Sequence, residues 1–386
     1  MKPLSVRTEK FNESLIRRMT RISSECGAIN LSQGFPDFDP PKAIMDRLAQ
    51  VAYEGPHQYP ITWGAKNMRE ALAKKQSYFM GLDLDPEENV LITVGGTEAM
   101  VCAMMALCDP GDKVAVFSPF FENYIAEIIM SGAEPIYIPL VPPTFSFDPE
   151  RLEDAFRQGA KALILCNPSN PSGKVFTREE LQIIADLAIK YDAYVVTDEV
   201  YEHIIYEPNK HTYIATLPGM WERTVSCGSL SKTYHITGWR IGYVIAPKHI
   251  EDRCKQIHDF TTVGAASPLM EAIVTGLEFP LTYYKELQDQ YQHMKDLFVG
   301  GLKNLGIPYS DPQGAYYVMV DIGPYCKNDD IGFCEWMARE VGVAAVPGCT
   351  FFKEDIHTMA RFHFAKKDET LYEALERLST LKKKLK

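Results

Sequence analysis

One segment combines residue types that could bind a phosphate and an aldehyde together. In SLSKTYHITGWRIGY (residues 229–243), a predicted strand end supplies hydroxyls at Ser229 and Ser231, an amine at Lys232 and a guanidinium at Arg240. Hydroxyls and a guanidinium suit a phosphate dianion, and an amine suits an aldehyde. Pyridoxal phosphate offers both groups in one small molecule, so the segment predicts a site for this cofactor. Taken alone, Lys232 is more simply a solvated surface lysine.

A pyridoxal phosphate site also needs a carboxylate, because the pyridine ring accepts electrons well only while its nitrogen is protonated. The segment VVTDEVY (195–201) places Asp198 at the end of an apolar strand. Taken alone, Asp198 is more simply a helix-capping or solvated residue. Open α/β sheets bind ligands at the carboxyl ends of their strands, where Asp198 and Lys232 both fall, and this favours a place for Asp198 beside the ring.

Backbone donors for the phosphate are expected in GGTEAM (95–100), which joins a predicted strand to a predicted helix. Gly96 and Thr97 would lie at the helix N-terminus, where free N–H groups and the helix dipole favour an anion. An ordinary strand-to-helix turn is the alternative interpretation of this segment.

A single arginine interrupts an apolar strand near the end of the chain. Arg361 lies between Met359 and Phe362. Burying an arginine is costly unless the side chain meets an anion. Arg361 is therefore expected either to bind an anionic ligand or to form a structural ion pair.

Several longer motifs resemble those of the fold-type I aminotransferases of class I and II. SLSKTYHITGWRIG is similar to the family's lysine motif, NPSNPSG (167–173) to its Asn-Pro-x-Asn-Pro-x-Gly signature, and TDEVY to its aspartate motif. The resemblance runs from LSQGFPDF (31–38) to ARFHF (360–364), which is nearly the whole chain. Within the family, LSQGFPDF, LPGMWERT (217–224) and DEVYEH resemble the kynurenine/glutamine aminotransferases and the bacterial methionine aminotransferases.

The resemblance implies roles in holding pyridoxal 5'-phosphate. Lys232 would form a Schiff base with the cofactor and move the substrate proton, and Asp198 would pair with the pyridine nitrogen. Asn170 and Tyr201 would hydrogen-bond the phenolic oxygen, and Phe121 would stack on the ring. The catalytic set would be Lys232, Asp198 and Tyr201. The phosphate would be held by Gly96, Thr97, Ser229 and Arg240.

The resemblance also implies how the substrate and a second subunit contribute. Arg361 would hold the substrate α-carboxylate through two hydrogen bonds, with help from Asn170 and from the backbone at Gly34. Tyr59, in HQYPITWG, is similar to a tyrosine that reaches the phosphate in the neighbouring subunit. The expected assembly is therefore a homodimer with shared active sites.

The expected activity is ping-pong transfer of an amino group between an L-amino acid and a 2-oxo acid. The residues predicted to contact the substrate side chain are mostly apolar, which favours aromatic amino acids, methionine or glutamine: Ile16, Phe35, Phe121, Tyr124 and Phe352. No added cation for a second carboxylate can be located, so an aspartate aminotransferase is a second choice.

Two further alternatives have the same fold but a different function. A cysteine-conjugate or cystathionine β-lyase would use the same residues to eliminate a leaving group. A non-enzymatic regulator that senses pyridoxal phosphate would need a DNA-binding domain, and the roughly 30 residues before LSQGFPDF are too few for one.

Short apolar strands alternate with amphipathic helices through the middle of the chain, which predicts an α/β fold. The large domain is expected to hold a mainly parallel seven-stranded sheet sandwiched by helices, because several strands are continuously apolar. A capping box from Thr177 to Glu180 marks the start of one helix. Strands are expected at 89–96, 112–119, 134–140, 161–168, 193–200 and 223–231, and a further helix at 121–130.

The pattern changes after about residue 275 and predicts a smaller α+β domain. A long helix is expected at 281–305, strands at 314–322 and 359–365, and helices at 333–341 and 368–385. A chain of 386 residues is expected to form two domains. The predicted division is 1–45 for the N-terminal arm and part of the small domain, 46–275 for the large cofactor-binding domain and 276–386 for the small domain.

The composition restricts partners and location. The net charge of -11 disfavours nucleic acid and anionic membranes as partners. Nine scattered cysteines contain no Cys-x-x-Cys pair, so neither a disulfide framework nor a metal site is expected. The reduced cysteines, the start MKPLSVRTEK without a signal peptide and the lack of a long apolar run predict a cytoplasmic protein.

Overall fold

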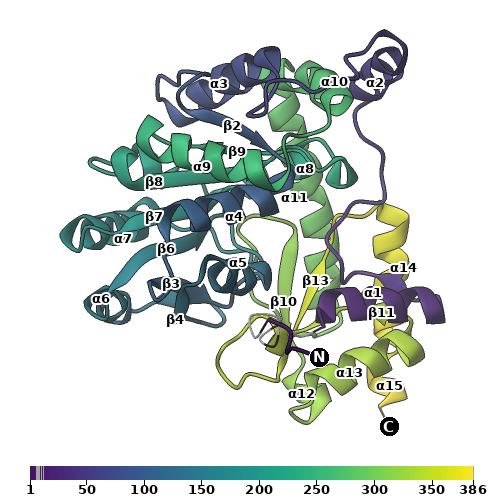
Figure 1. Ribbon diagram of the computed structural model, residues 1–386. Helices are drawn as coiled ribbons and strands as arrows, with labels where there is room; N and C mark the ends of the chain where they lie inside the picture. The colour runs from purple at the N-terminus through teal and green to yellow at the C-terminus, as the bar shows by residue number, and fades with distance from the viewer. Residues whose placement is uncertain (6–8, 10, 12, 386) are drawn as a thin grey trace.

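The computed structural model describes residues 1–5, 9, 11 and 13–385, and its largest element is an eight-stranded sheet (Figure 1). The strand order is β2-β9-β8-β7-β6-β3-β4-β5. The five strands from β8 to β4 run parallel, whereas β9 and β5 pair antiparallel with their neighbours. The strands are β2 (Val90–Thr93), β3 (Lys113–Ser118), β4 (Glu134–Val141), β5 (Ser146–Phe147), β6 (Ala160–Cys166), β7 (Tyr194–Asp198), β8 (Thr224–Ser229) and β9 (Gly242–Ile245).

Helices cover both faces of this sheet, which explains why its strands are apolar at consecutive positions. In β3, Val114 and Val116 pack into one core, while Ala115 and Phe117 pack into the core on the opposite face. The first core is closed by α4 (Gly95–Leu107), α5 (Asn123–Ser131) and α9 (Lys248–Thr261). The second is closed by α6 (Pro149–Arg157) and α7 (Arg178–Lys190).

The predicted α/β fold is confirmed, with one strand more than expected. The sequence placed neither β9 nor β5. The shorter of the two, β5, consists of two residues that pair antiparallel with the end of β4. Two residues are too few for a periodic pattern, so the tertiary pairing alone creates this strand. The predicted capping box is present, because the Thr177 hydroxyl accepts from the Glu180 N–H and the Glu180 carboxylate accepts from the Thr177 N–H.

A second, three-stranded antiparallel sheet has the order β10-β13-β12. Its strands are β10 (Tyr317–Asp321), β12 (Val346–Pro347) and β13 (Met359–His363). The surrounding helices are α11 (Leu281–Asn304), α12 (Gly323–Cys326), α13 (Asp330–Trp336), α14 (Asp368–Ser379) and α15 (Leu381–Lys384). A π-helical turn, Met337–Val341, continues α13, where the sequence predicted one helix at 333–341.

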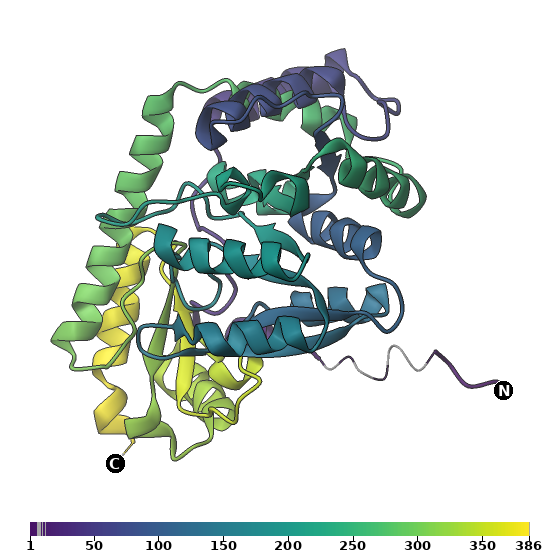
Figure 2. The same ribbon diagram turned by 90° about the vertical axis from the view of Figure 1, so that its left-hand side faces the viewer.

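The remaining elements lie around these two sheets. Figure 2 shows α11 running along one side of the molecule, from the end near α2 and α3 to the end that holds α14. None of the helices in the described part of the chain is long and apolar enough to cross a membrane. The domain boundaries at residues 45 and 275 stay predictions. The helices and strands outside the two sheets and their covering helices are α1 (Leu15–Cys26), β1 (Ile29–Asn30), α2 (Lys42–Glu54), α3 (Lys66–Met80), α8 (Leu230–Thr233), α10 (Ser267–Leu277) and β11 (Val343–Ala344).

Candidate active site

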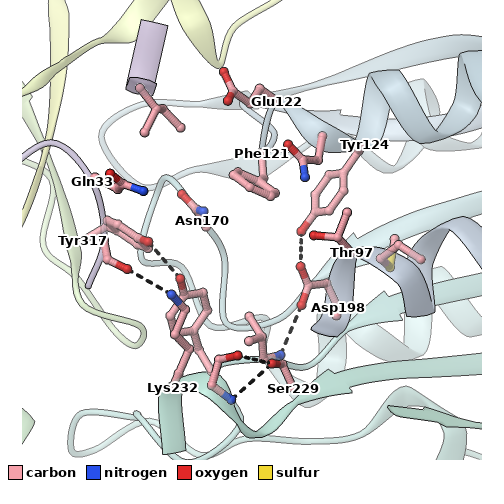
Figure 3. Close-up of a pocket in the computed structure, with 18 of the residues that line it drawn as sticks. Gln33, Thr97, Phe121, Glu122, Tyr124, Asn170, Asp198, Ser229, Lys232 and Tyr317 are labelled. Atoms are coloured by element: carbon pink, nitrogen blue, oxygen red, sulfur yellow. Dashed lines mark hydrogen bonds between the residues drawn. The ribbon is translucent and has the colours of Figure 1, made fainter. Parts of the chain in front are cut away.

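A cavity of about 460 Å³ opens where the carboxyl ends of β6, β7 and β8 face the smaller sheet (Figure 3). The parallel arrangement brings these strand ends to one edge of the sheet, as expected for a ligand site. Most of the predicted site residues line the cavity, and Tyr59, Phe35 and Phe352 do not. The lining residues that were predicted are Ile16, Gly34, Gly96, Thr97, Phe121, Tyr124, Asn170, Asp198, Tyr201, Ser229, Ser231, Lys232, Arg240 and Arg361.

Lys232 lies on the single-turn helix α8, directly after β8. Its ammonium group donates a hydrogen bond to the carbonyl oxygen of Gly34 at 2.9 Å, across the cavity from its own strand. Burial, followed by the positive charges of Arg240 and Arg361, lowers the pKa of Lys232 from 10.5 to about 7. A large fraction of this side chain is therefore a neutral, nucleophilic amine near neutral pH.

Asp198 ends β7 and presents its carboxylate to the same cavity. One oxygen accepts a hydrogen bond from the Tyr124 hydroxyl at 2.6 Å, and the other accepts from the backbone N–H of Val200 at 3.2 Å. Burial raises the pKa of Asp198, and the two hydrogen bonds and the charge of Lys232 oppose that rise. The carboxylate is thus held in place and suited to pair with a cation in the cavity.

A second carboxyl group in the cavity, Glu127, was not predicted. Its side chain is 2% exposed, and neither oxygen has a hydrogen-bond partner among the described residues. Burial and the nearby charge of Asp198 raise the pKa of Glu127 well above its usual range. Burial therefore favours the protonated form of Glu127, whereas Asp198 has hydrogen-bond donors that favour its charged form.

The predicted phosphate donors form a close-packed concave surface. Gly96 and Thr97 lie in the first turn of α4, and the Ser229 hydroxyl donates to the Ser231 hydroxyl at 2.8 Å. A Cβ atom on Gly95 would lie 2.2 Å from a guanidinium nitrogen of Arg240, so only glycine fits there. Hydroxyls, helix N–H groups and a guanidinium that converge in this way match the donors that an anion requires.

Arg361 is 1% exposed and lies in the middle of β13. Its guanidinium donates to the side-chain oxygen of Asn170 at 2.6 Å and to the carbonyl oxygen of Ser32 at 2.8 Å, and it lies between the rings of Tyr317 and Phe351. Among the described residues, no carboxylate forms an ion pair with it, and its Nε has no partner. A buried cation with unused donors favours ligand binding over a structural ion pair.

The structure corrects two residues predicted to contact the substrate side chain. Phe35 and Phe352 do not contribute to the cavity lining. The Phe35 ring instead lies under the ammonium group of Lys366 at 4.6 Å. Phe352 is 7% exposed and belongs to the hydrophobic core that also contains Leu163 and Val195 of the large sheet. The sequence pattern identified both as apolar but could not decide which apolar side chain faces a core and which faces a cavity.

Polar residues at the cavity wall were also missed. They are neighbours in sequence of predicted residues, which was the available signal: Arg17 beside Ile16, Gln33 beside Gly34, and Glu122 and Asn123 between Phe121 and Tyr124. Tyr317 was missed as well, although its hydroxyl lies 2.9 Å from that of Tyr201. Further lining residues without a prediction are Met100 and Val200.

Tyr59 lies outside the cavity, in the loop between α2 and α3. Its side chain is 86% exposed. Within one chain it contributes nothing to the cavity, so its predicted role depends on a second subunit.

Comparisons with known proteins agree with this geometry. The family model described as "Aminotransferase class I and II" matches residues 27–378. Kynurenine--oxoglutarate transaminase 3 of Bos taurus is 34% identical over 96% of this chain and 88% of its own length. Methionine aminotransferase of Escherichia coli (strain K12) is 34% identical over 96% of this chain and 97% of its own. The structure of N-succinyldiaminopimelate aminotransferase from Mycobacterium tuberculosis superposes with a TM-score of 0.95 at 33% identity, covering 98% of this chain and 100% of that one.

Proposed function

Because the chain belongs to the class I and II aminotransferase family, we propose that its cavity is the active site and that Lys232 is the residue that binds the cofactor covalently. The protein is a pyridoxal-phosphate-dependent enzyme that transfers an amino group between an amino acid and a 2-oxo acid. The β-lyase, aspartate aminotransferase and regulator alternatives are not favoured. The observation that carries the assignment is a partly neutral lysine in one cavity with an anion-binding surface, a carboxylate and a buried arginine.

The residues present fit pyridoxal phosphate. When bound, this cofactor supplies a carbonyl that condenses with amines and a ring that accepts the electrons released at the substrate Cα. Asp198 would hold a proton on the ring nitrogen, and Asn170 and Tyr201 would donate to the ring oxygen. Phe121 would cover one face of the ring. The phosphate would accept hydrogen bonds from Gly96, Thr97, Ser229, Ser231 and Arg240.

The remaining residues would act on the substrate. Lys232, as a neutral amine, would remove the proton from the substrate Cα and later return a proton to the cofactor carbon. Arg361 would hold the α-carboxylate with its unused donors, which fixes the substrate beside Lys232. Ile16, Phe121 and Tyr124 give the cavity wall an apolar part, beside the polar Arg17 and Glu122. This apolar part supports aromatic amino acids, methionine or glutamine as donors.

The substrate preference is tested in half-reactions. The cofactor-loaded enzyme is mixed with one amino acid at a time, without a 2-oxo acid, and the loss of the initial cofactor absorbance and the 2-oxo acid formed are followed. Aromatic amino acids, methionine or glutamine should react fastest and yield one 2-oxo acid per site. Release of pyruvate from a β-substituted cysteine without amino transfer would contradict the proposal.

The pH dependence of cofactor capture follows from the environment of Lys232. Only the neutral amine attacks an aldehyde, and the pKa of Lys232 is about 7. We expect the rate at which cofactor-free protein reacts with pyridoxal phosphate to rise with pH through about 7 and to level off above it, as measured by stopped-flow absorbance. In Arg240→Gln the midpoint should move to higher pH, because a cation that lowers this pKa is removed. A midpoint near 10.5 in the unmodified protein would contradict the assignment.

Asp198→Asn should lower kcat by roughly 10- to 150-fold. The neutral amide cannot form the charge-assisted hydrogen bond to the ring nitrogen, which contributes about 1.5–3 kcal/mol. Steady-state kinetics with the best amino donor measures this loss. Glu127→Gln is the matched control, because it changes the second buried carboxyl group of the same cavity wall, which has no hydrogen-bond partner among the described residues, and it should retain most activity. Equal losses in the two variants would point to disturbed packing instead.

We propose a homodimer whose subunit interface includes the exposed residues around Tyr59. Exposed apolar and aromatic side chains lie on two segments, 53–61 at the end of α2 and in the loop after it, and 260–263 at the end of α9. The two segments are in contact because His258 Nε2 lies 2.8 Å from the carbonyl oxygen of Thr62. Exposed apolar clusters of this kind are typical of subunit interfaces. The exposed residues are Tyr53, Tyr59, Ile61, Phe260 and Val263. In this dimer Tyr59 would donate to the phosphate in the partner's active site.

A mixed dimer of two variants, each altered in a different residue, tests the shared site. Tyr59→Phe should weaken cofactor binding, and Lys232→Ala should be inactive. In a mixed dimer, one site would combine an intact Lys232 with an intact Tyr59 of the partner subunit and recover normal cofactor affinity. If the Tyr59→Phe defect persists in the mixed dimer, Tyr59 acts within its own chain or not at all.

A reducing, cytoplasmic location is proposed because all nine cysteines are free thiols: Cys26, Cys102, Cys108, Cys166, Cys227, Cys254, Cys326, Cys334 and Cys349.

A further inference from the structure

A cluster of three metal-ligating side chains lies outside the active site, beside the smaller sheet. Asp330 begins α13, Cys349 lies in the short helical turn Gly348–Thr350, and His357 lies in the loop before β13. One ligand atom from each residue lies within 4.8 Å of the other two. The Asp330 side chain is 0% exposed, and the His357 side chain is 33% exposed, so the cluster is anchored inside the protein and open on one side.

The hydrogen bonds orient the imidazole as a metal ligand would be oriented. His357 Nδ1 faces the Asp330 carboxylate at 2.9 Å, and its Nε2 faces the Asp355 carboxylate at 3.1 Å. Metal-bound histidines usually donate their other ring N–H to a carboxylate, which is the place that Asp355 occupies. The second oxygen of Asp330 accepts from the Cys349 N–H at 2.7 Å, which fixes the backbone beside the thiol.

The charge around the cluster favours a cation. Asp330 and Asp355 flank the single imidazole of His357, and Asp329 lies next in sequence. The negative potential of these carboxylates attracts a metal ion.

We propose that Asp330, Cys349 and His357 bind a thiophilic divalent cation, with Zn²⁺ as the best match. The ligands would be one carboxylate oxygen, the Cys349 sulfur and His357 Nδ1, with water in the fourth position. Binding releases the thiol proton and the Nδ1 proton to solvent. Ligands about 2.0–2.3 Å from Zn²⁺ lie roughly 3.4 Å apart in a tetrahedron, so the 2.9 Å separation of Asp330 and His357 must widen slightly.

The loop between Cys349 and His357 connects this cluster to the active-site wall. The Phe351 carbonyl accepts from the Phe120 N–H at 2.9 Å, and the Phe351 ring lies 4.7 Å from the Arg361 guanidinium. The Lys353 N–H donates to the Ser118 hydroxyl at 2.9 Å. A cation that joins both ends of this loop to α13 therefore stabilises the folded protein.

The test uses metal-free, cofactor-loaded enzyme titrated with Zn²⁺ by calorimetry and with Co²⁺ by visible absorbance. We expect one ion per chain, a thiolate-to-Co²⁺ charge-transfer band, and a rise in Tm of about 3–5 °C at saturating Zn²⁺. Mg²⁺ should not compete, because it prefers oxygen ligands. Cys349→Ser and His357→Gln should each weaken binding by at least about tenfold and remove the Zn²⁺-dependent rise in Tm.

Two matched controls separate the site from adventitious binding. Cys26→Ser removes a thiol that lies in an exposed residue. His293→Gln disrupts an exposed histidine–aspartate pair, in which Nε2 lies 2.8 Å from Asp368. Both controls should bind Zn²⁺ normally. No stoichiometric binding, or binding that survives Cys349→Ser but is lost in a control, would overturn the proposal. Each Zn²⁺-dependent change in Tm is compared within one variant, so an altered basal stability does not obscure the result.

Discussion

Lys232→Ala is expected to lower aminotransferase activity by about 10⁴-fold or more. The replacement removes both the nucleophile that binds the cofactor and the base that moves the Cα proton, and a positioned base alone contributes about 10²–10⁴-fold. In the unmodified enzyme, borohydride reduction should fix the cofactor on the peptide that contains Lys232. In Lys232→Ala no peptide should carry it. Mass spectrometry and single-turnover kinetics measure the two effects.

The controls for this variant distinguish chemistry from folding. The Lys232 amine is desolvated in the folded protein, so its removal should not lower the Tm of the cofactor-free protein. Lys232→Arg retains a cation but offers no neutral amine, and it should be as inactive as Lys232→Ala. Lys66→Ala removes a lysine that is 71% exposed and should leave activity unchanged. Activity that survives in Lys232→Ala, or cofactor fixed at another lysine, would refute the assigned role.

Arg361→Leu is expected to lower kcat/KM for amino acids by roughly 10²–10⁴-fold. Two charge-assisted hydrogen bonds to the α-carboxylate, each contributing about 1.5–3 kcal/mol, would be lost. The loss is expected because Arg361 is buried and meets no carboxylate of the described residues. Arg361→Lys keeps a point charge without the planar pair of donors. Its kcat/KM should lie between those of the unmodified enzyme and Arg361→Leu.

An amine without a carboxylate separates this effect from damage to the cavity. Arg361 also holds Asn170 and the Ser32 carbonyl, so Arg361→Leu disturbs two protein contacts as well. The unmodified enzyme should process such an amine poorly, and Arg361→Leu should process it about equally poorly. If the variant loses the same factor on both substrates, Arg361 supports the structure and does not recognise the carboxylate.

The local sequence determined the cofactor-binding side of the active site. Asp198 ends its strand, and Lys232 and Gly96 lie within three residues after theirs. The carboxyl ends of these strands lie at one edge of the sheet. Strand and helix periods are local properties, so the alternation predicted the α/β layers and the capping box at Thr177 without knowledge of any contact. The sequence order of strands and helices was therefore enough to predict that these residues share one cofactor site.

Only the tertiary structure decided which other side chains join them. Glu127 lies on the buried side of α5 and reaches the cavity, and Phe352 was wrongly predicted to do the same but lies in the core. The period of an element tells which side chains are buried, whereas the packing of distant segments decides whether the buried side chain meets a cavity or a core.

The same distinction applies to electrostatics and to the proposed metal cluster. The sequence shows that residue 232 is a lysine, but the pKa of about 7 of this lysine arises from burial, from Arg240 in the same segment and from Arg361 on a distant strand. The spacing of Asp330, Cys349 and His357 along the chain is not that of a known metal-ligand motif. The cysteine spacing therefore predicted no metal site there. They meet because three separate segments pack together, and distances across such contacts are set by the whole fold and not by local sequence.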